Sequence, residues 1–186
     1  VIGLEMATYF ALAGTKVEIV EATGKVAGNL DADATGVLQK ACEEFGMKFR
    51  LNTRASAFSD GKVTVEKDGA KENILCEKVL LCIGRTANTE GYGLETLHVP
   101  LEKRAIAVDD YCMTGVPGLY AIGDCNGTGM LAHVAYRQAE VAVNHILGKN
   151  DPMRWSCVPS LVHTEPEAAF VGKSLIEAKA EGIDAV

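Results

Sequence analysis

Gly3 and Glu21 have the spacing of a dinucleotide-binding unit. Gly3 opens an apolar, alanine-rich stretch, and Glu21 ends the short β-branched segment 16–21, 18 positions later. In such units glycines let the first helix approach a strand and the pyrophosphate, and an acidic residue about 20 positions on binds ribose hydroxyls. A carboxylate there repels a 2′-phosphate, so Glu21 favours NAD over NADP. The alternative is a structural glycine and a strand-end acid, which many α/β proteins contain.

Asp124 is the second candidate for cofactor chemistry. It ends the apolar segment 117–124 and precedes a small-residue loop and a predicted helix at 131–147. The start of a helix offers unpaired backbone N–H groups and the positive end of the helix dipole, which suit a nucleotide cofactor. We expect Asp124 to bind a sugar or ribityl hydroxyl. The alternative is an acid that caps a loop before an ordinary helix.

The elements that must position these residues alternate between helix and strand. Apolar residues at helical spacing predict helices at 2–13, 31–45, 131–147 and 175–181, and a glycine follows each predicted helix. Alternating apolar and polar residues predict strands at 47–52, 54–59, 62–67 and 72–76, an antiparallel meander with turns at Asp60-Gly61 and Asp68-Gly69. Nearly continuous apolar runs at 78–83 and 117–124 predict strands buried in a parallel sheet, and 160–163 predicts another strand. Together these segments predict an α/β protein.

Charge and composition argue against several classes of protein. The chain has 18 basic and 25 acidic residues, a net charge of -7 and no basic run, which argues against nucleic-acid binding. Its longest strongly apolar stretch, 79–83, is far shorter than the roughly 20 residues of a membrane span. There is no signal-peptide pattern. The six cysteines lack metal-ligand spacing and are typical of reduced thiols, so we expect a cytoplasmic protein with no metal site.

Four segments together resemble the dihydrolipoamide dehydrogenase family, which belongs to the class I pyridine nucleotide-disulfide oxidoreductases. Residues 1–7 are similar to the end of that family's G-x-G-x-x-G-x-E motif, and 82–88 to its strand-end motif beside the nicotinamide. Residues 118–133 resemble its second FAD-binding segment, and 158–172 the entry to its interface domain. The segments follow the family's order and spacing and cover essentially the whole chain.

The resemblance implies a Rossmann-type, three-layer fold that binds NAD(P) and FAD and carries an antiparallel meander. Residues 1–97 would form an NAD-binding domain without its first strand, 98–150 the C-terminal part of an FAD-binding domain, and 151–186 the start of a dimerisation domain. Such enzymes are homodimeric flavoproteins. They oxidise protein-bound dihydrolipoamide and pass its electrons through FAD to NAD. The implied partner is a lipoyl domain or acyltransferase of a 2-oxo acid dehydrogenase complex.

The resemblance also assigns cofactor roles to matching positions. NAD would be held by Val1, Ile2, Gly3, Leu4 and Glu5, by Glu21 and Ala55 on the adenosine side, and by Gly84 beside the nicotinamide half. Asp124 would bind the ribityl or phosphate side of FAD. Near the flavin's pyrimidine ring, which gains negative charge on reduction, backbone N–H groups would come from Met130, Leu131, Ala132 and His133. Glu5 would pair with a lysine of the FAD domain, or simply favour the helix dipole.

No residue of this chain matches the family's catalytic groups. The redox C-x-x-x-x-C of the family falls before position 1, and its catalytic histidine with glutamate falls after position 186. None of the six cysteines, and none of the histidines at 98, 133, 145 and 163, stands in those motifs. We therefore assign no catalytic residue, and expect the chain alone to be inactive and poorly stable, because its central sheet lacks a strand. The alternatives are another disulfide reductase or transhydrogenase of the superfamily, or a non-catalytic nucleotide-binding fragment.

Overall fold

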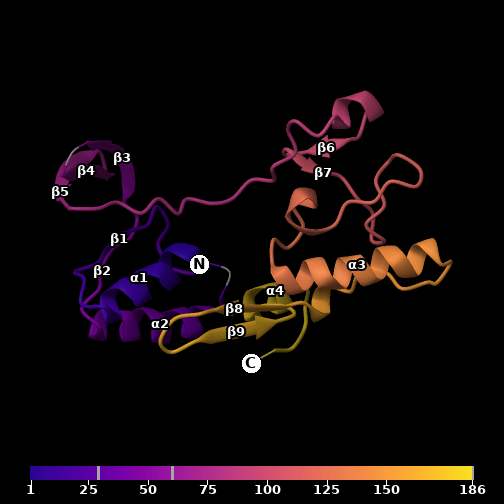
Figure 1. The fold of residues 1–186 in the computed structure, drawn as a ribbon. Coiled ribbons are helices and arrows are strands. Elements are labelled where there is room, and N and C mark those ends of the chain that lie inside the picture. The colour runs from indigo at the N-terminus through magenta and orange to yellow at the C-terminus, as the bar shows by residue number, and fades with distance from the viewer. Residues whose placement is uncertain (29, 60, 186) are drawn as a thin grey trace. The chain divides into compact units, whose positions relative to one another are not determined.

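The computed structural model describes residues 1–28, 30–59 and 61–185 of the chain. They form two compact units (Figure 1). The first unit contains residues 1–82 and the segment from Pro159 onward, and the second contains residues 83–158. These units divide the chain at other places than the predicted domain boundaries at 97 and 150, which refer to the domains of the complete family and stay predictions.

A βαβ arrangement forms the base of the first unit. Helix α1 (Ile2–Leu12) leads to strand β1 (Glu18–Val20), and helix α2 (Ala32–Glu44) connects β1 to strand β2 (Lys48–Arg50). The two strands pair in parallel, with Glu18 opposite Lys48 and Val20 opposite Arg50. Parallel neighbours need a crossover of this kind. The prediction that 47–52 belongs to the meander is therefore wrong, because its hydrogen-bonded partner is β1.

The meander itself consists of three strands in the order β3-β4-β5. They are β3 (Arg54–Ser59), β4 (Lys62–Lys67) and β5 (Ala70–Leu75), paired antiparallel. Val63 and Val65 of β4 are buried, whereas every residue of β3 that the structure describes is exposed. Asp68 and Gly69 both have positive φ, as a tight hairpin turn requires. The predicted turn at 60–61 includes Asp60, which lies outside the described residues.

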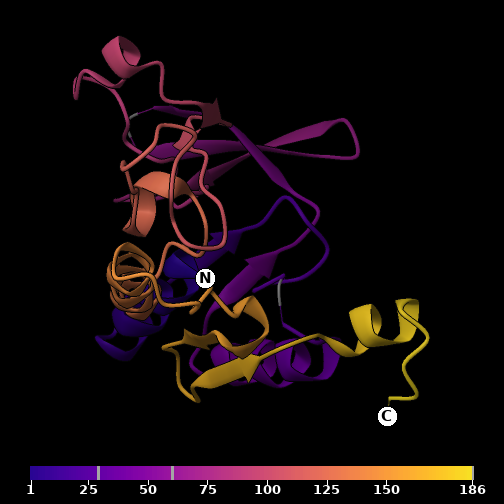
Figure 2. The same cartoon turned by 90° about the vertical axis from the view of Figure 1, so that its right-hand side faces the viewer.

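One hydrophobic core holds the βαβ arrangement together. Leu4 and Ala7 of α1 pack with Leu38 and Cys42 of α2 and with Val162, and all five are buried. Val162 ends strand β8 (Pro159–Val162), which pairs antiparallel with β9 (Ala168–Val171). Figure 2 shows these two strands lying against α2. Leu4 and Val162, which are 158 positions apart in the sequence, therefore share one core.

The helix ends follow the sequence pattern, although one cap differs from expectation. Helix α4 (Leu175–Ala180) starts at Ser174, whose side chain forms a reciprocal capping box with Glu177. Asp31 stands at the start of α2 as predicted, but its side chain makes no cap hydrogen bond with that helix. Asp31 Oδ1 instead accepts the backbone N–H of Leu175 at 3.0 Å. The carboxylate thus stabilises the first turn of α4.

Two segments predicted as buried strands are not strands. Residues 78–83, all described, form no ladder, and Leu81 and Ile83 are 60% and 88% exposed. In 117–124, Tyr120 makes only an isolated bridge to Met113, and a short helix, η2 (Gly123–Asn126), follows. A strand buried in a parallel sheet needs hydrogen-bonded neighbours. Among the described residues, only β1 and β2 form a parallel pair, and neither segment pairs with them.

The second unit is built around helix α3 (Ala132–Ile146). Val134, Val141 and Ala142 of α3 pack with Cys112 and Met153. The region 85–116, expected to be mostly loop, contains a short helix, η1 (Leu94–Leu97), and a hairpin of β6 (Leu101–Glu102) and β7 (Ala105–Ile106). Another short helix, η3 (Trp155–Cys157), lies near the C-terminal end of the second unit.

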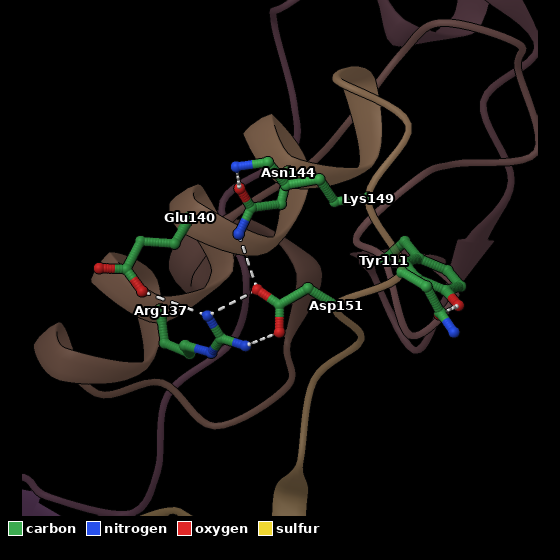
Figure 3. Close-up of polar contacts among 7 residues, drawn as sticks. Tyr111, Arg137, Glu140, Asn144, Lys149 and Asp151 are labelled. Carbon is green, nitrogen blue, oxygen red and sulfur yellow. Dashed lines mark hydrogen bonds and ion pairs between the residues drawn. The ribbon is translucent and has the colours of Figure 1, made fainter.

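A cluster of polar side chains connects the segment that follows α3 to α3 itself by hydrogen bonds and ion pairs (Figure 3). Asp151 accepts two hydrogen bonds from Arg137, at 3.0 and 2.5 Å, and one from Asn144 Nδ2 at 2.7 Å. Arg137 also reaches Glu140 at 3.2 Å, and Tyr111 donates to Asn150 Oδ1 at 2.6 Å. The Arg137 guanidinium and, second, the Asn144 amide lower the pKa of Asp151 below its ordinary value.

We predict that Asp151→Asn lowers the melting temperature at pH 7, and that the difference from the wild type shrinks toward pH 3. A carboxyl whose pKa is depressed by folding stabilises the protein above its unfolded pKa of about 3.9, and this contribution is lost as pH falls through the folded value. Circular dichroism melts at both pH values measure it. The control is Asp110→Asn, because Asp110 is an exposed residue of the same unit that lies outside the helices and makes no ion pair with any described residue. A gap that is constant with pH would contradict the prediction.

Candidate functional site

The start of α1 makes the close approach expected of a nucleotide-binding helix. A Cβ placed on Gly3 would lie 3.1 Å from Cβ of Cys82, closer than a side chain tolerates without a shift. Glycine at this position therefore lets the helix start beside the segment 78–82. Val1 precedes the helix without a side-chain cap, so the backbone N–H groups of Ile2 and Gly3 have no intrahelical partner. Such an open helix start suits an anionic group.

The other NAD candidates at this helix differ in their exposure. Val1 and Ile2 are each 46% exposed, whereas the Leu4 side chain is buried in the core. Leu4 can therefore contribute only through its backbone, and its N–H donates to the Val1 carbonyl at 2.8 Å.

Glu5 has a partner that the sequence did not indicate. Its Oε1 accepts the backbone N–H of His163, at the end of β8, at 2.8 Å. The His163 ring in turn bonds Glu167 Oε1 through Nδ1 at 2.8 Å. The hydrogen bond with Glu167, together with the negative charges of Glu167 and Glu5, raises the pKa of His163. The spacing of His163 and Glu167 gave no signal for this pair, because residues four apart meet on a helix, whereas this segment connects β8 to β9.

Glu21 lies at the carboxyl end of β1, where open α/β sheets bind ligands. Its Oε1 accepts both the backbone N–H and the hydroxyl of Thr23, at 2.7 and 2.8 Å. Among the described residues, its Oε2 accepts no hydrogen bond. Glu21 also extends the ladder beyond both strands, because its N–H donates to the Arg50 carbonyl and its carbonyl accepts the N–H of Thr53. Ala55, exposed in β3, follows two positions after Thr53.

Asp124 and Gly84 belong to the second unit. The Asp124 carboxylate pairs with the Arg85 guanidinium, Oδ2 to Nη2, at 2.5 Å. These side chains are 46% and 57% exposed, and a surface pair of this kind contributes only about 0–1 kcal/mol, so a ligand hydroxyl can compete for the carboxylate. Gly84 has a φ of 128°, which an L side chain rarely adopts, and a Cβ there would meet open space.

The start of α3 lies eight residues after Asp124. Leu131 precedes the helix without a side-chain cap, and Ala132 and His133 in its first turn are exposed. The Leu131 N–H donates to the Gly129 carbonyl at 2.6 Å, and Met130 is half-buried. An exposed helix start of this kind carries partial positive charge. It fits the pyrimidine side of a flavin, which becomes negative on reduction.

The thiols show no redox pair. All six cysteines lie in the described part of the chain and are free, with Cys42 and Cys112 buried and Cys82 and Cys157 exposed. Burial raises the pKa of Cys112 to about 11, and the nearby charges of Asp109 and Asp110 add to the shift.

We predict that Cys157 is alkylated by iodoacetamide at pH 8 at least ~100-fold faster than Cys112. The thiolate is the reactive form, and both the raised pKa and the burial of Cys112 suppress it. Peptide mass spectrometry over a time course measures both rates, with Cys82 as a second exposed reference. Similar alkylation rates at Cys112 and Cys157 would show that the reagent reaches the core around α3, and would contradict the burial of Cys112.

Two structural features are absent from the described residues. They contain no group of three or more His, Cys, Asp or Glu side chains that could hold a metal ion. None of their helices has the length and apolar character needed to cross a membrane.

Known proteins with similar sequences and structures point to one family. The pyridine nucleotide-disulphide oxidoreductase family matches residues 1–139. Mitochondrial dihydrolipoyl dehydrogenase from Canis lupus familiaris is 39% identical over 99% of this chain and 38% of its own length. The protein of that name from Dictyostelium discoideum is 35% identical over 98% of this chain and 39% of its length. The chain thus spans about two-fifths of these relatives.

Solved structures agree with this assignment. LpdA from Mycobacterium tuberculosis superposes with a TM-score of 0.88 at 33% identity, over 98% of this chain and 40% of LpdA. The flavoprotein disulfide reductase RclA from Escherichia coli superposes with a TM-score of 0.84 at 24% identity, over 98% of this chain and 43% of RclA, a similarity that concerns the fold alone. The predicted Rossmann-type α/β class is therefore confirmed. The chain belongs to the pyridine nucleotide-disulphide oxidoreductase family.

Proposed function

We propose that this chain supplies the NAD-binding and flavin-facing parts of an FAD-dependent disulfide oxidoreductase. The whole protein would oxidise protein-bound dihydrolipoamide and pass the electrons to FAD and then to NAD. It would work as a cytoplasmic homodimer with a lipoyl domain or acyltransferase as partner. The chain by itself would be inactive, because it contains no residue that matches the family's dithiol or base. The similarity to dihydrolipoyl dehydrogenases over 99% of the chain supports this proposal.

One observation carries the NAD part of the proposal. The uncapped start of α1, where Gly3 allows close approach to Cys82, belongs to the same unit as Glu21 at the carboxyl end of β1. Backbone N–H groups at the helix start would bind the pyrophosphate. Glu21 Oε2, which accepts no hydrogen bond from the described residues, would bind ribose hydroxyls.

The second unit carries the proposed flavin contacts. Asp124 would accept a ribityl hydroxyl in exchange for part of its pairing with Arg85. The uncapped start of α3 would stabilise negative charge on the pyrimidine side of the flavin. Bound FAD would supply the two-electron redox chemistry between a dithiol and NAD. The residues of this chain would bind and orient both cofactors rather than react with the dithiol.

The Glu21 carboxylate offers the direct test of nucleotide preference. We predict that the chain binds NADH at least about tenfold more tightly than NADPH, and that Glu21→Gln weakens NADH binding about tenfold while narrowing that preference. NADH fluorescence titrations measure both constants. Glu44→Gln, at an exposed position of α2, is the matched control and should change neither. Equal binding of NADH and NADPH by the wild type, or an unchanged Glu21→Gln variant, would refute the proposed role.

A further inference from the structure

The threonine two residues after Glu21 holds one oxygen of the Glu21 carboxylate. The backbone N–H and the hydroxyl of Thr23 both donate to Glu21 Oε1, at 2.7 and 2.8 Å. The hydroxyl oxygen also lies 3.0 Å from the Lys25 carbonyl. Because one hydroxyl carries one proton, it donates to one of these acceptors at a time, and the charged carboxylate forms the stronger hydrogen bond. Oε1 is thus occupied, and Oε2, which has no donor among the described residues, is the oxygen left for a ligand.

The backbone of the same loop is held by the segment that follows β2. The Asn52 N–H donates to the Thr23 carbonyl, and the Thr53 N–H to the Glu21 carbonyl, each at 2.9 Å. A Cβ on Gly24 would lie 3.3 Å from Asn52 Oδ1, so glycine permits the close approach of the two segments. None of these contacts involves the Thr23 side chain, which is exposed. A change in that side chain therefore leaves both the loop backbone and the core in place.

A fixed carboxylate and a mobile one differ in how they discriminate between nucleotides. A glutamate side chain has three rotatable bonds, and holding it in one conformation costs conformational entropy. Where the protein already holds the side chain, ligand binding does not bear that cost. A held carboxylate also cannot turn away from a 2′-phosphate, so the repulsion between the two negative charges is kept. Both effects favour NAD over NADP.

We propose that Thr23 is the positioning residue of Glu21, and that its hydroxyl sets how strongly the site prefers NAD to NADP. The threonine acts through the carboxylate, because it occupies Oε1 and leaves Oε2 for the ribose hydroxyls. The backbone N–H of position 23 supplies one of the two hydrogen bonds whatever the side chain is. The second requires a hydroxyl on Cβ, which only serine and threonine carry. This inference rests on the proposed function.

Two substitutions at position 23 separate the hydroxyl from the rest of the side chain. Thr23→Val keeps the shape and removes the hydroxyl, and we expect NADH to bind about fivefold more weakly while NADPH binds no more weakly than to the wild type. Thr23→Ser keeps the hydroxyl, and both affinities should stay within about twofold of the wild type. Thr64→Val is the matched control, because it removes a hydroxyl of the same unit that donates to Asn73 Oδ1 in the meander. It should change neither affinity.

A double variant tests whether Thr23 acts through Glu21. In a Glu21→Ala background there is no carboxylate to hold, so adding Thr23→Val should change NADH binding by less than about twofold. A direct contact between Thr23 and the nucleotide would instead produce the same fivefold loss in both backgrounds, and this result would overturn the positioning role.

Fluorescence titrations of the full chain with NADH and with NADPH measure these affinities. NMR couplings across the Cα–Cβ bond of Glu21 report its rotamer without any nucleotide, and should show one predominant rotamer in the wild type and averaging in Thr23→Val. Equal couplings in the two proteins overturn the fixing of Glu21, and an unchanged preference for NADH in Thr23→Val overturns the role in selectivity. A wild-type chain that binds no NADH refutes the proposed NAD site and with it this inference, while the couplings still report the contact between Thr23 and Glu21.

Discussion

Replacing Asp124 with alanine is expected to weaken FAD binding about 100-fold. Hydrogen bonds to a charged acceptor contribute about 1.5–3 kcal/mol, and the alanine variant removes the only carboxylate that we assign to the ribityl side. The structure already shows that this carboxylate attracts donors, since it pairs with Arg85 at 2.5 Å on an exposed surface. Flavin fluorescence during titration measures the change in affinity.

Two further variants make the Asp124 result specific. Asp110→Ala removes an exposed aspartate of the same unit and should leave FAD binding unchanged. Arg85→Ala removes the competing donor and should leave FAD binding equal or tighter. If Asp124→Ala bound FAD as tightly as the wild type, or if Arg85→Ala lost binding to the same degree as Asp124→Ala, the assignment of the carboxylate to the ribityl hydroxyls would be wrong.

Replacing Leu38 with alanine is expected to lower the free energy of unfolding of the first unit by about 3 kcal/mol. Leu38 is 1% exposed and belongs to the core that also contains Leu4 and Ala7 of α1. Truncation leaves a cavity that the surrounding helices fill only in part. Urea denaturation followed by circular dichroism measures the loss.

The neighbouring residue provides the matched control for that change. Val37 lies on the same helix but is 63% exposed, so Val37→Ala should cost less than about 0.5 kcal/mol. The core also carries the start of α1, so Leu38→Ala should weaken NADH binding at temperatures near its melting point, and Val37→Ala should not. Equal destabilisation by the two substitutions would mean that α2 does not pack as the structure shows.

Local signals in the sequence predicted the helices and the three meander strands β3, β4 and β5 well, but they failed for segments whose partners lie far away in the sequence. The glycines at 14, 46 and 148 marked helix ends, and Ser174 marked a helix start, because caps depend on neighbouring residues. The apolar run at 78–83 indicated burial but could not name a partner strand, and it is exposed in the structure. Likewise, β2 alternates as a meander strand would, yet pairs with β1 through a crossover that only the tertiary fold reveals.

In the candidate site too, local sequence patterns indicated individual residues but not their distant partners. Residue type and spacing were enough to select Gly3, Glu21 and Asp124. The partner of Asp124, Arg85, is 39 positions away, and the His163 backbone that binds Glu5 is 158 positions away. No local pattern predicts such approaches. The sequence also gave no sign that Gln138 of α3 is buried, since a glutamine inside a helix usually faces solvent. Only the tertiary structure shows that it is 0% exposed and that its Oε1 accepts the backbone N–H of Gly123.

The most direct test of the central claim is the visible absorption spectrum of the purified protein that carries this chain, recorded during titration with NADH. The proposed function predicts a flavin band near about 450 nm that loses intensity as NADH is added and recovers when NAD and an oxidant for the thiols are supplied. A protein that shows no such band, even after incubation with added FAD, or a band that NADH leaves unchanged, would contradict an NAD-linked flavoprotein function.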